Sequence, residues 1–255
     1  MQIDPISAFK DNYIWALRND RNVAVVDPGD ARPVQEYLAR KQLQLVAILA
    51  THHHADHVGG ISALVAARSR GIPVYGPKGE PISTVTHRVA GGDRVAIPEL
   101  DIEFDVLDIP GHTRAHIAYY GSKMVFCGDT LFACGCGRVF EGTPAQMYAS
   151  LQKLANLPEA TLAYCGHEYT LANIGFARNV EPGNAALAER EREDTLTRER
   201  KRPTLPTSIG RERATNPFLR CENAEVDRAA ARRLGKAVTD PVEIFAAIRD
   251  WKNKY

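Results

Sequence analysis

The segment that most constrains this chain is Thr51–His57, which reads Thr-His-His-His-Ala-Asp-His. In the pattern H-x-H-x-D-H it packs metal-ligating side chains closely together, directly after the apolar run Leu45–Ala50. That run predicts a buried strand. A loop at a strand end can turn alternate side chains toward one point, whereas a helix would splay them. Two imidazoles at i and i+2 suit one divalent ion, and the Asp and His that follow suit a second.

Later segments repeat one form, in which a metal ligand stands beside a glycine near the end of a predicted strand. They are Gly111-His112-Thr113, Gly128-Asp129-Thr130 and Gly166-His167-Glu168. Glycine lets the backbone approach an ion closely and adopt unusual φ values. A single histidine is more often an ordinary core or surface residue, but the ordered set predicts a metal centre. The remaining histidines lack this setting and are predicted not to be ligands: His53, His87 and His116.

Strand and helix patterns alternate along the first two-thirds of the chain, which is typical of an α/β fold. The predicted strands include 13–17, 23–27, 45–50, 72–75, 100–106, 116–120, 123–127 and 161–165. Helices are predicted at 31–42, 59–70, 144–155 and 241–252. After about residue 168 no convincing strand follows, and the charged run Glu189–Arg202 predicts a solvated helix face. We therefore expect an α/β domain at residues 1–168 and a small helical domain at residues 169–255.

Composition excludes several classes of protein. With 255 residues and a formal net charge of +1, the chain shows no global attraction to nucleic acid or to a membrane. The start, Met1–Pro5, has neither a basic nor an apolar signal region. The five cysteines are an odd number without a C-x-x-C pair, which favours reduced thiols. We expect a cytoplasmic monomer that acts on a small molecule.

The string Thr51–His57, together with His112, Asp129 and His167, resembles the metallo-β-lactamase superfamily, whose fold is an αβ/βα sandwich. More narrowly, the chain is similar to the glyoxalase II family, the hydroxyacylglutathione hydrolases. This similarity covers essentially the whole chain, including the helical tail. It rests on Lys10–Tyr13, Gly128–Phe132, Cys136–Arg138, Cys165–Thr170 and Thr215–Arg220.

The resemblance implies two divalent metal ions, with zinc expected and iron or manganese as alternatives. It assigns one ion to His52, His54 and His112. It assigns the second ion to Asp56, His57 and His167, with Asp129 bridging the two. Asp56 and Asp129 are the expected catalytic residues as well as ligands. Two cations would lower the pKa of a bridging water toward neutrality, which supplies hydroxide.

The resemblance further implies hydrolysis of S-(2-hydroxyacyl)glutathione, such as S-D-lactoylglutathione, to glutathione and D-lactate by this metal-bridging hydroxide. That is the second step of methylglyoxal detoxification. The expected substrate-binding residues are Arg138, Phe140, Tyr169, Arg249 and Lys252. Cations there suit the two carboxylates of glutathione. Phe140 stands where some family members carry a tyrosine, so one hydroxyl contact is absent.

Other readings stay open from the residues alone. A lactonase, β-lactamase or nuclease of the same fold would share the metal motif. A diiron flavoprotein would typically carry glutamate at His54, and a mononuclear-iron persulfide dioxygenase would lack ligands such as Asp56. A metal-binding module whose tail contacts RNA is disfavoured by the net charge. Thiolate ligation by Cys127, Cys134 or Cys136 is disfavoured, because the nitrogen and oxygen ligands already fill two sites. Covalent chemistry by Cys134 or Cys136 is disfavoured, because no histidine outside the metal set is placed to activate the thiol.

Overall fold

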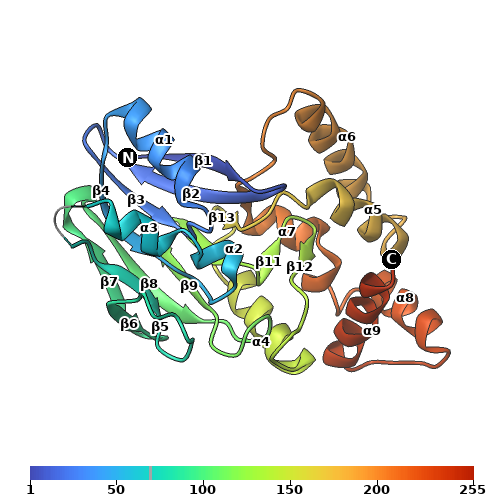
Figure 1. Cartoon of the computed structure of the whole chain (residues 1–255). Coiled ribbons are helices and arrows are strands. Elements are labelled where there is room, and N and C mark those ends of the chain that lie inside the picture. Colours follow the sequence, from blue (N-terminus) through green and yellow to red (C-terminus); the bar gives the residue numbers. More distant parts are fainter. Residues whose placement is uncertain (69–70) are drawn as a thin grey trace. The chain divides into compact units, whose positions relative to one another are not determined.

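The computed structural model describes residues 1–68 and 71–255 and divides into two compact units (Figure 1). Unit 1 comprises Met1–Asp108, Thr113–Gly128 and Tyr164–His167. Unit 2 comprises Ile109–His112, Asp129–Ala163 and Glu168–Tyr255. Each unit is therefore built from segments that are distant in the sequence.

Unit 1 contains a six-stranded sheet with the strand order β1-β2-β3-β4-β5-β6. The first three strands run antiparallel, and β3 to β6 are parallel neighbours. The strands are β1 (Gln2–Ala8), β2 (Asn12–Arg18), β3 (Asn22–Val26), β4 (Gln44–Leu49), β5 (Val74–Pro77) and β6 (His87–Val89). Parallel strands place their carboxyl ends at one edge, which is where the segment 51–57 leaves β4.

Three helices follow strands of this sheet: α1 (Ala31–Lys41), α2 (Ala55–Val58) and α3 (Ile61–Ala66). Asp30 caps α1 by accepting from the Arg32 N–H. Val34 and Tyr37 of α1 pack in one buried cluster with alternate residues of the strands, including Ile14. Because strand side chains alternate between faces, the residues between them point to the opposite face of the sheet.

A second sheet, of six strands, contributes to unit 1 the consecutive strands β13-β10-β9-β8-β7. Its strands are β7 (Arg94–Ile97), β8 (Ile102–Asp108), β9 (Ile117–Gly121), β10 (Met124–Gly128) and the later half of β13 (Leu162–Cys165). Tyr119 Oη donates to Ala50 O at 2.9 Å, and Trp15 Nε1 donates to Cys165 O at 2.9 Å. These buried bonds join the two sheets face to face, so unit 1 is a β-sandwich with helices on its outer face.

Unit 2 is mainly helical. Its β elements are short: β11 (Leu131–Phe132) pairs with β12 (Gly135–Cys136), and β14 (Thr207–Ser208) pairs with the first half of β13. Thr143 starts α4 with a capping box to Gln146. The helices are α4 (Pro144–Ala155), α5 (Thr170–Val180), α6 (Ala185–Glu199), α7 (Ile209–Thr215), α8 (Ala224–Leu234) and α9 (Pro241–Asn253).

Most sequence-predicted elements are present within one or two residues of their expected bounds. The helix expected at 59–70 is wrong: α3 covers only Ile61–Ala66, and the preceding turn forms the separate α2. Ser69 and Arg70 of that expectation lie outside the described residues. The tail also contains one short strand, β14, that was not expected. The division at residue 168 into two domains stays a prediction. In the part of the chain that the structure describes, no helix is long and apolar enough to cross a membrane.

Candidate metal centre and adjoining cavity

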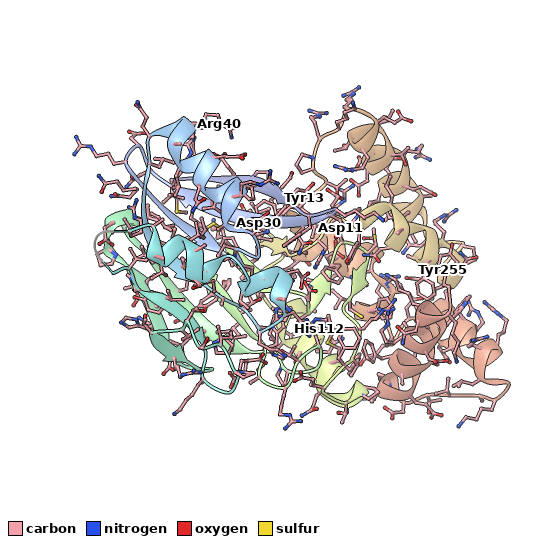
Figure 2. The ribbon with its side chains drawn as sticks, in the orientation of Figure 1. Asp11, Tyr13, Asp30, Arg40, His112 and Tyr255 are labelled. Carbon is pink, nitrogen blue, oxygen red and sulfur yellow. The ribbon has the colours of Figure 1, made fainter. Side chains whose placement is uncertain are left out.

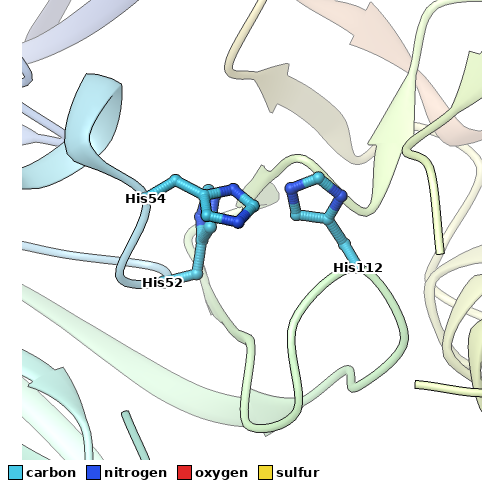
Figure 3. A group of neighbouring side chains, drawn as sticks. All are labelled: His52, His54 and His112. Atoms are coloured by element: carbon cyan, nitrogen blue, oxygen red, sulfur yellow. The ribbon is translucent and has the colours of Figure 1, made fainter. Parts of the chain in front are cut away.

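The H-x-H-x-D-H motif lies where β4 ends, but only its first half is a loop. His52 and His54 occupy that loop, and α2 begins at Ala55, so Asp56 and His57 sit on a short helix. We expected a helix to splay such side chains, yet α2 carries two of the candidate ligands. His52 Nε2 lies 3.1 Å from His54 Nδ1, and the two rings meet edge to face. Figure 3 shows these imidazoles, and also His112, which follows β8.

Asp27 orients two of the histidines through a buried network. Its carboxylate accepts from Thr51 N at 2.8 Å, from Thr51 Oγ1 at 2.7 Å and from His57 Nδ1 at 3.1 Å. Because Thr51 Oγ1 gives its one hydrogen to Asp27, it accepts from His52 Nδ1 at 3.0 Å. Both imidazoles are therefore held as the tautomer with a lone pair on Nε2, the form that ligates a metal.

Asp56, His57 and His167 form the second group of donors in unit 1, with one ligand atom from each within 4.8 Å of the others. Asp56 Oδ2 lies 3.6 Å from His57 Nε2 and 3.4 Å from His167 Nε2. Asp11, in the turn between β1 and β2 (Figure 2), accepts from His167 Nδ1 at 2.9 Å. Asn12 donates to Asp56 Oδ2 at 3.0 Å. In both His57 and His167 the Nδ1 atom has a carboxylate acceptor, so Nε2 is left to face Asp56. Metal-binding histidines are held in the same way.

His112 and Asp129 form a pair in unit 2. His112 Nε2 lies 3.6 Å from Asp129 Oδ2, and both residues are buried. His112 Nδ1 donates to the carbonyl of Arg138 at 2.8 Å. Gly137 permits this approach, because a Cβ there would lie 1.9 Å from Asp129 O and 3.0 Å from His112 Nδ1. Imidazole nitrogens and carboxylate oxygens bind divalent metals such as zinc, iron or manganese. In such sites the second ring nitrogen of the histidine typically bonds to the protein, as Nδ1 of His112 does here.

The three histidines that were predicted not to be ligands differ in their settings. His116 is buried and stacks on His52 with centroids 4.6 Å apart, and its Nδ1 bonds Ile117 O. His53 pairs with the buried Glu80. His87 is exposed on β6. Their status as non-ligands stays a prediction.

The residues that hold the candidate ligands in place were not predicted from the sequence. Burial alone would raise the pKa of Glu80, but bonds from Thr113, His53 and the Ala115 N–H outweigh it and lower that pKa. Glu80 is thus a buried carboxylate. In the sequence around Glu80, only the presence of an acidic residue in a turn could have indicated this role. Acidic residues are common in turns, so that signal is weak. For Asp11 and Asn12, the signal was their place in a motif shared with the family.

A cavity of about 410 Å³ lies in unit 2, within the range of small-molecule sites. Both His112 and Asp129 line it. So does every residue that the sequence assigned to substrate binding, although these come from three segments of the chain. They are Arg138, Phe140, Tyr169, Arg249 and Lys252.

The two cations of α9 are embedded in the cavity wall. Arg249 is only 6% exposed, and its Nη1 donates to Cys136 O at 2.8 Å. Its buried Nε has no hydrogen-bond partner among the described residues. Lys252 Nζ donates to Asn173 Oδ1. Burial lowers the pKa of Lys252 to about 7, and the adjacent Arg249 guanidinium acts in the same direction.

The other cavity residues are more exposed. Arg138 and Phe140 lie at the surface, and the Phe140 ring stands 5.3 Å from that of His112. Tyr169 is 36% exposed and packs edge-on against Phe132 at 5.2 Å. An ordinary surface charge therefore remains a fair description of Arg138, but not of Arg249.

All five cysteines are free and buried. Burial raises the pKa of Cys134 to about 12 and also raises that of Cys136. A thiol that resists ionisation is a poor nucleophile and a poor metal ligand. This environment agrees with the expectation that neither cysteine takes part in the chemistry.

Comparison with known families covers nearly the whole chain. The model described as metallo-beta-lactamase superfamily matches residues 9–167, and the model described as hydroxyacylglutathione hydrolase C-terminus matches residues 168–255. Hydroxyacylglutathione hydrolase from Nitrosomonas eutropha is 54% identical over 255 residues, spanning 100% of this chain and 99% of that protein. The chain belongs to the hydroxyacylglutathione hydrolase family. The resemblance inferred from the sequence is confirmed, and the protein is a hydrolase of the metallo-β-lactamase fold.

Further members and solved structures agree with this family. The Nitrosomonas europaea hydroxyacylglutathione hydrolase is 53% identical, spanning 100% of this chain and 97% of that protein. The crystal structure of ETHE1 from Myxococcus xanthus has a TM-score of 0.66 and 25% identity, spanning 99% of this chain and 98% of that one. TTHA1623, solved in a di-iron-bound form, has a TM-score of 0.59 and 26% identity, spanning 85% and 100%. These neighbours share the predicted fold, and one of them holds two metal ions.

Proposed function

We propose that the protein hydrolyses the thioester bond of 2-hydroxyacylglutathiones, S-D-lactoylglutathione in particular, to glutathione and D-lactate. In this role it would carry out the second step of methylglyoxal detoxification. One observation carries the proposal: a single cavity is lined by the candidate ligands His112 and Asp129 and by the embedded cations Arg249 and Lys252. Family membership supports the same substrate class.

We assign the metal ligands as the family pattern implies. One ion would be held by His52, His54 and His112, and the other by Asp56, His57 and His167, with Asp129 shared. Zinc, iron and manganese all suit this donor set. When bound, two such ions supply Lewis acidity and make water a strong nucleophile near neutral pH.

The chain's own residues orient the donors and the substrate. Asp27 and Asp11 fix the tautomers of His57 and His167, so that their Nε2 atoms need no rearrangement to ligate. Arg249 and Lys252 offer positive charge to the carboxylates of the glutathione moiety. Tyr169 and Phe140 add aromatic surface at the same cavity.

The leaving group removes the need for a proton donor. A thiol has a pKa of about 8.5, so a thiolate departs without general-acid help, whereas an amine or alkoxide would not. We therefore expect kcat to rise with pH to a plateau. A descending limb below about pH 8 that one carboxylate substitution removes would show that an acid takes part.

The deciding experiment compares substrates on one preparation whose metal content has been measured. We expect turnover of S-D-lactoylglutathione to exceed that of a lactone, a β-lactam and a phosphodiester, with two ions bound per chain. Faster turnover of any of the other three would assign the site to a different hydrolase of the same fold.

The five buried free thiols suit a reducing compartment such as the cytoplasm. The expected monomer stays a prediction.

A further inference from the structure

Glu80 is a buried carboxylate that holds two loops at once. Its side chain is 1% exposed and lies in the turn between β5 and β6. On one side, Oε2 accepts from the backbone N–H of His53 at 3.0 Å and pairs with His53 Nδ1. On the other side, Oε1 accepts from Thr113 Oγ1 at 2.7 Å and from Ala115 N at 3.0 Å.

These two loops carry the histidines assigned to one metal ion. His53 stands between His52 and His54 in the sequence, and Thr113 directly follows His112. The carboxylate therefore accepts from the backbone N–H of His53, which lies between two of these histidines, and from the hydroxyl of Thr113, next to the third. It occupies none of the nitrogens of the three imidazoles. Asp27 and Asp11, by contrast, contact residues of the other group directly.

Glu80 is itself fixed in place. Arg88 donates to Glu80 O at 3.0 Å and to Ile82 O at 3.2 Å, which closes the turn. Gly79 lets this turn approach the second loop, because a Cβ there would lie 2.7 Å from Ala115 Cβ. The Glu80 carboxylate is therefore a fixed connection between the two loops and not a mobile surface charge.

We propose that Glu80 is a positioning residue for the metal ion assigned to His52, His54 and His112. This inference rests on the proposed function. The four donors that meet Glu80 are N–H and O–H groups, and only an ionised carboxylate offers acceptors to all of them. A glutamine would turn one NH2 toward a donor, so it would satisfy one loop and repel the other. The two loops would then no longer be held in the spacing that the three imidazoles require.

The test is metal titration of the full-length protein with Co²⁺, followed by absorption, for wild type, Glu80→Gln and Thr113→Val. Partners that orient metal ligands typically contribute about ten- to a hundred-fold in affinity. We expect Glu80→Gln to weaken one of the two ions by about that factor while the other keeps its wild-type affinity. Thr113→Val, which removes one donor, should weaken the same ion by less. Excess metal should restore the activity of both variants.

Glu181→Gln is the matched control, because Glu181 is equally buried and pairs with Arg220 in unit 2. It should lower stability and leave both metal affinities unchanged. If Glu80→Gln binds both ions as wild type does, or weakens both equally and in step with stability, the positioning role is overturned. If instead the affinities change as expected while wild type fails to cleave glutathione thioesters, the proposed substrate is wrong and the role of Glu80 stands.

Discussion

Arg249 donates a hydrogen bond from Nη1 to the backbone carbonyl of Cys136, across 113 residues of sequence. The bond connects α9, the last helix, to the β11–β12 hairpin that follows Asp129. The same guanidinium lies 5.2 Å above the Phe218 ring. The last helix therefore forms one wall of the cavity that His112 and Asp129 also line.

Replacing Arg249 or Lys252 by alanine should raise KM for a glutathione thioester with little change in kcat. The contacts are expected to act alike in the ground and transition states. A charge-assisted hydrogen bond contributes about 1.5–3 kcal/mol, so KM should rise about ten- to a hundred-fold. Lys254→Ala is the control, because Lys254 is exposed at the end of the same helix. The comparison should include a thioester without the glycyl carboxylate. If both variants match wild type on both substrates, α9 does not contribute to the binding of glutathione.

Affinity for an S-alkylated glutathione should fall as pH rises through about 7. Lys252 has a pKa of about 7 against 10.5 for an ordinary lysine, so its charge is lost in that range. Between those values the unfolded chain binds more protons, so the ligand-free protein should also gain stability as pH rises through 7. Calorimetry from pH 6 to 8.5 measures the affinity. Lys252→Arg should bind without this slope, and a slope that persists in it would rule out Lys252 as the source.

His54→Ala and Asp129→Ala should each lower metal content together with activity. Both residues supply donor atoms, and Asp129 is assigned to both ions. Metal analysis and steady-state rates on the same samples make the measurement. His87→Ala serves as the control, because that histidine is exposed on β6. Full metal content and normal turnover in either ligand variant would refute the assignment of that residue.

Arg190→Met should lower the free energy of unfolding by about 3–5 kcal/mol, because it leaves a buried carboxylate unpaired. Arg190 Nη1 lies 2.7 Å from Glu212 Oε1 and Nε lies 3.1 Å from Asp194 Oδ2, with all three residues buried. Arg192→Met, two residues along the same helix, should change it by less than about 0.5 kcal/mol because Arg192 is exposed. Urea unfolding measures both. Equal effects would show that the buried cluster contributes little.

The candidate ligands could be named from the sequence because metal chemistry restricts residue type and because the motif is local. Their supports could not. Asp27 binds Thr51 and His57 only once β3 and β4 pair, and nothing in its neighbours distinguishes it from other acids. Glu80 acts across 27 residues to His53 and across 33 to Thr113. Such roles depend on tertiary contacts, which a single sequence does not show.

In the charged run of α6, the sequence predicted exposure for residues that the structure shows to be buried. Its composition predicted a solvated face, and Arg192 follows that prediction. Arg190 and Asp194 do not, because α7 brings Glu212 against them and the three charges satisfy one another. Residue type sets the average burial of a charge, but the partner decides the individual case.

The buried cysteines have a consequence for an enzyme whose expected product is a free thiol. Glutathione released beside exposed, ionised protein thiols would enter mixed disulfides whenever the surroundings became oxidising. Here burial keeps Cys134, Cys136 and Cys221 protonated, with pKa values above the ordinary one, and none of the five thiols lies at the surface. Exchange requires a thiolate, and burial disfavours that form at these three cysteines. Cys134, Cys136 and Cys221 should therefore resist S-glutathionylation by the expected product.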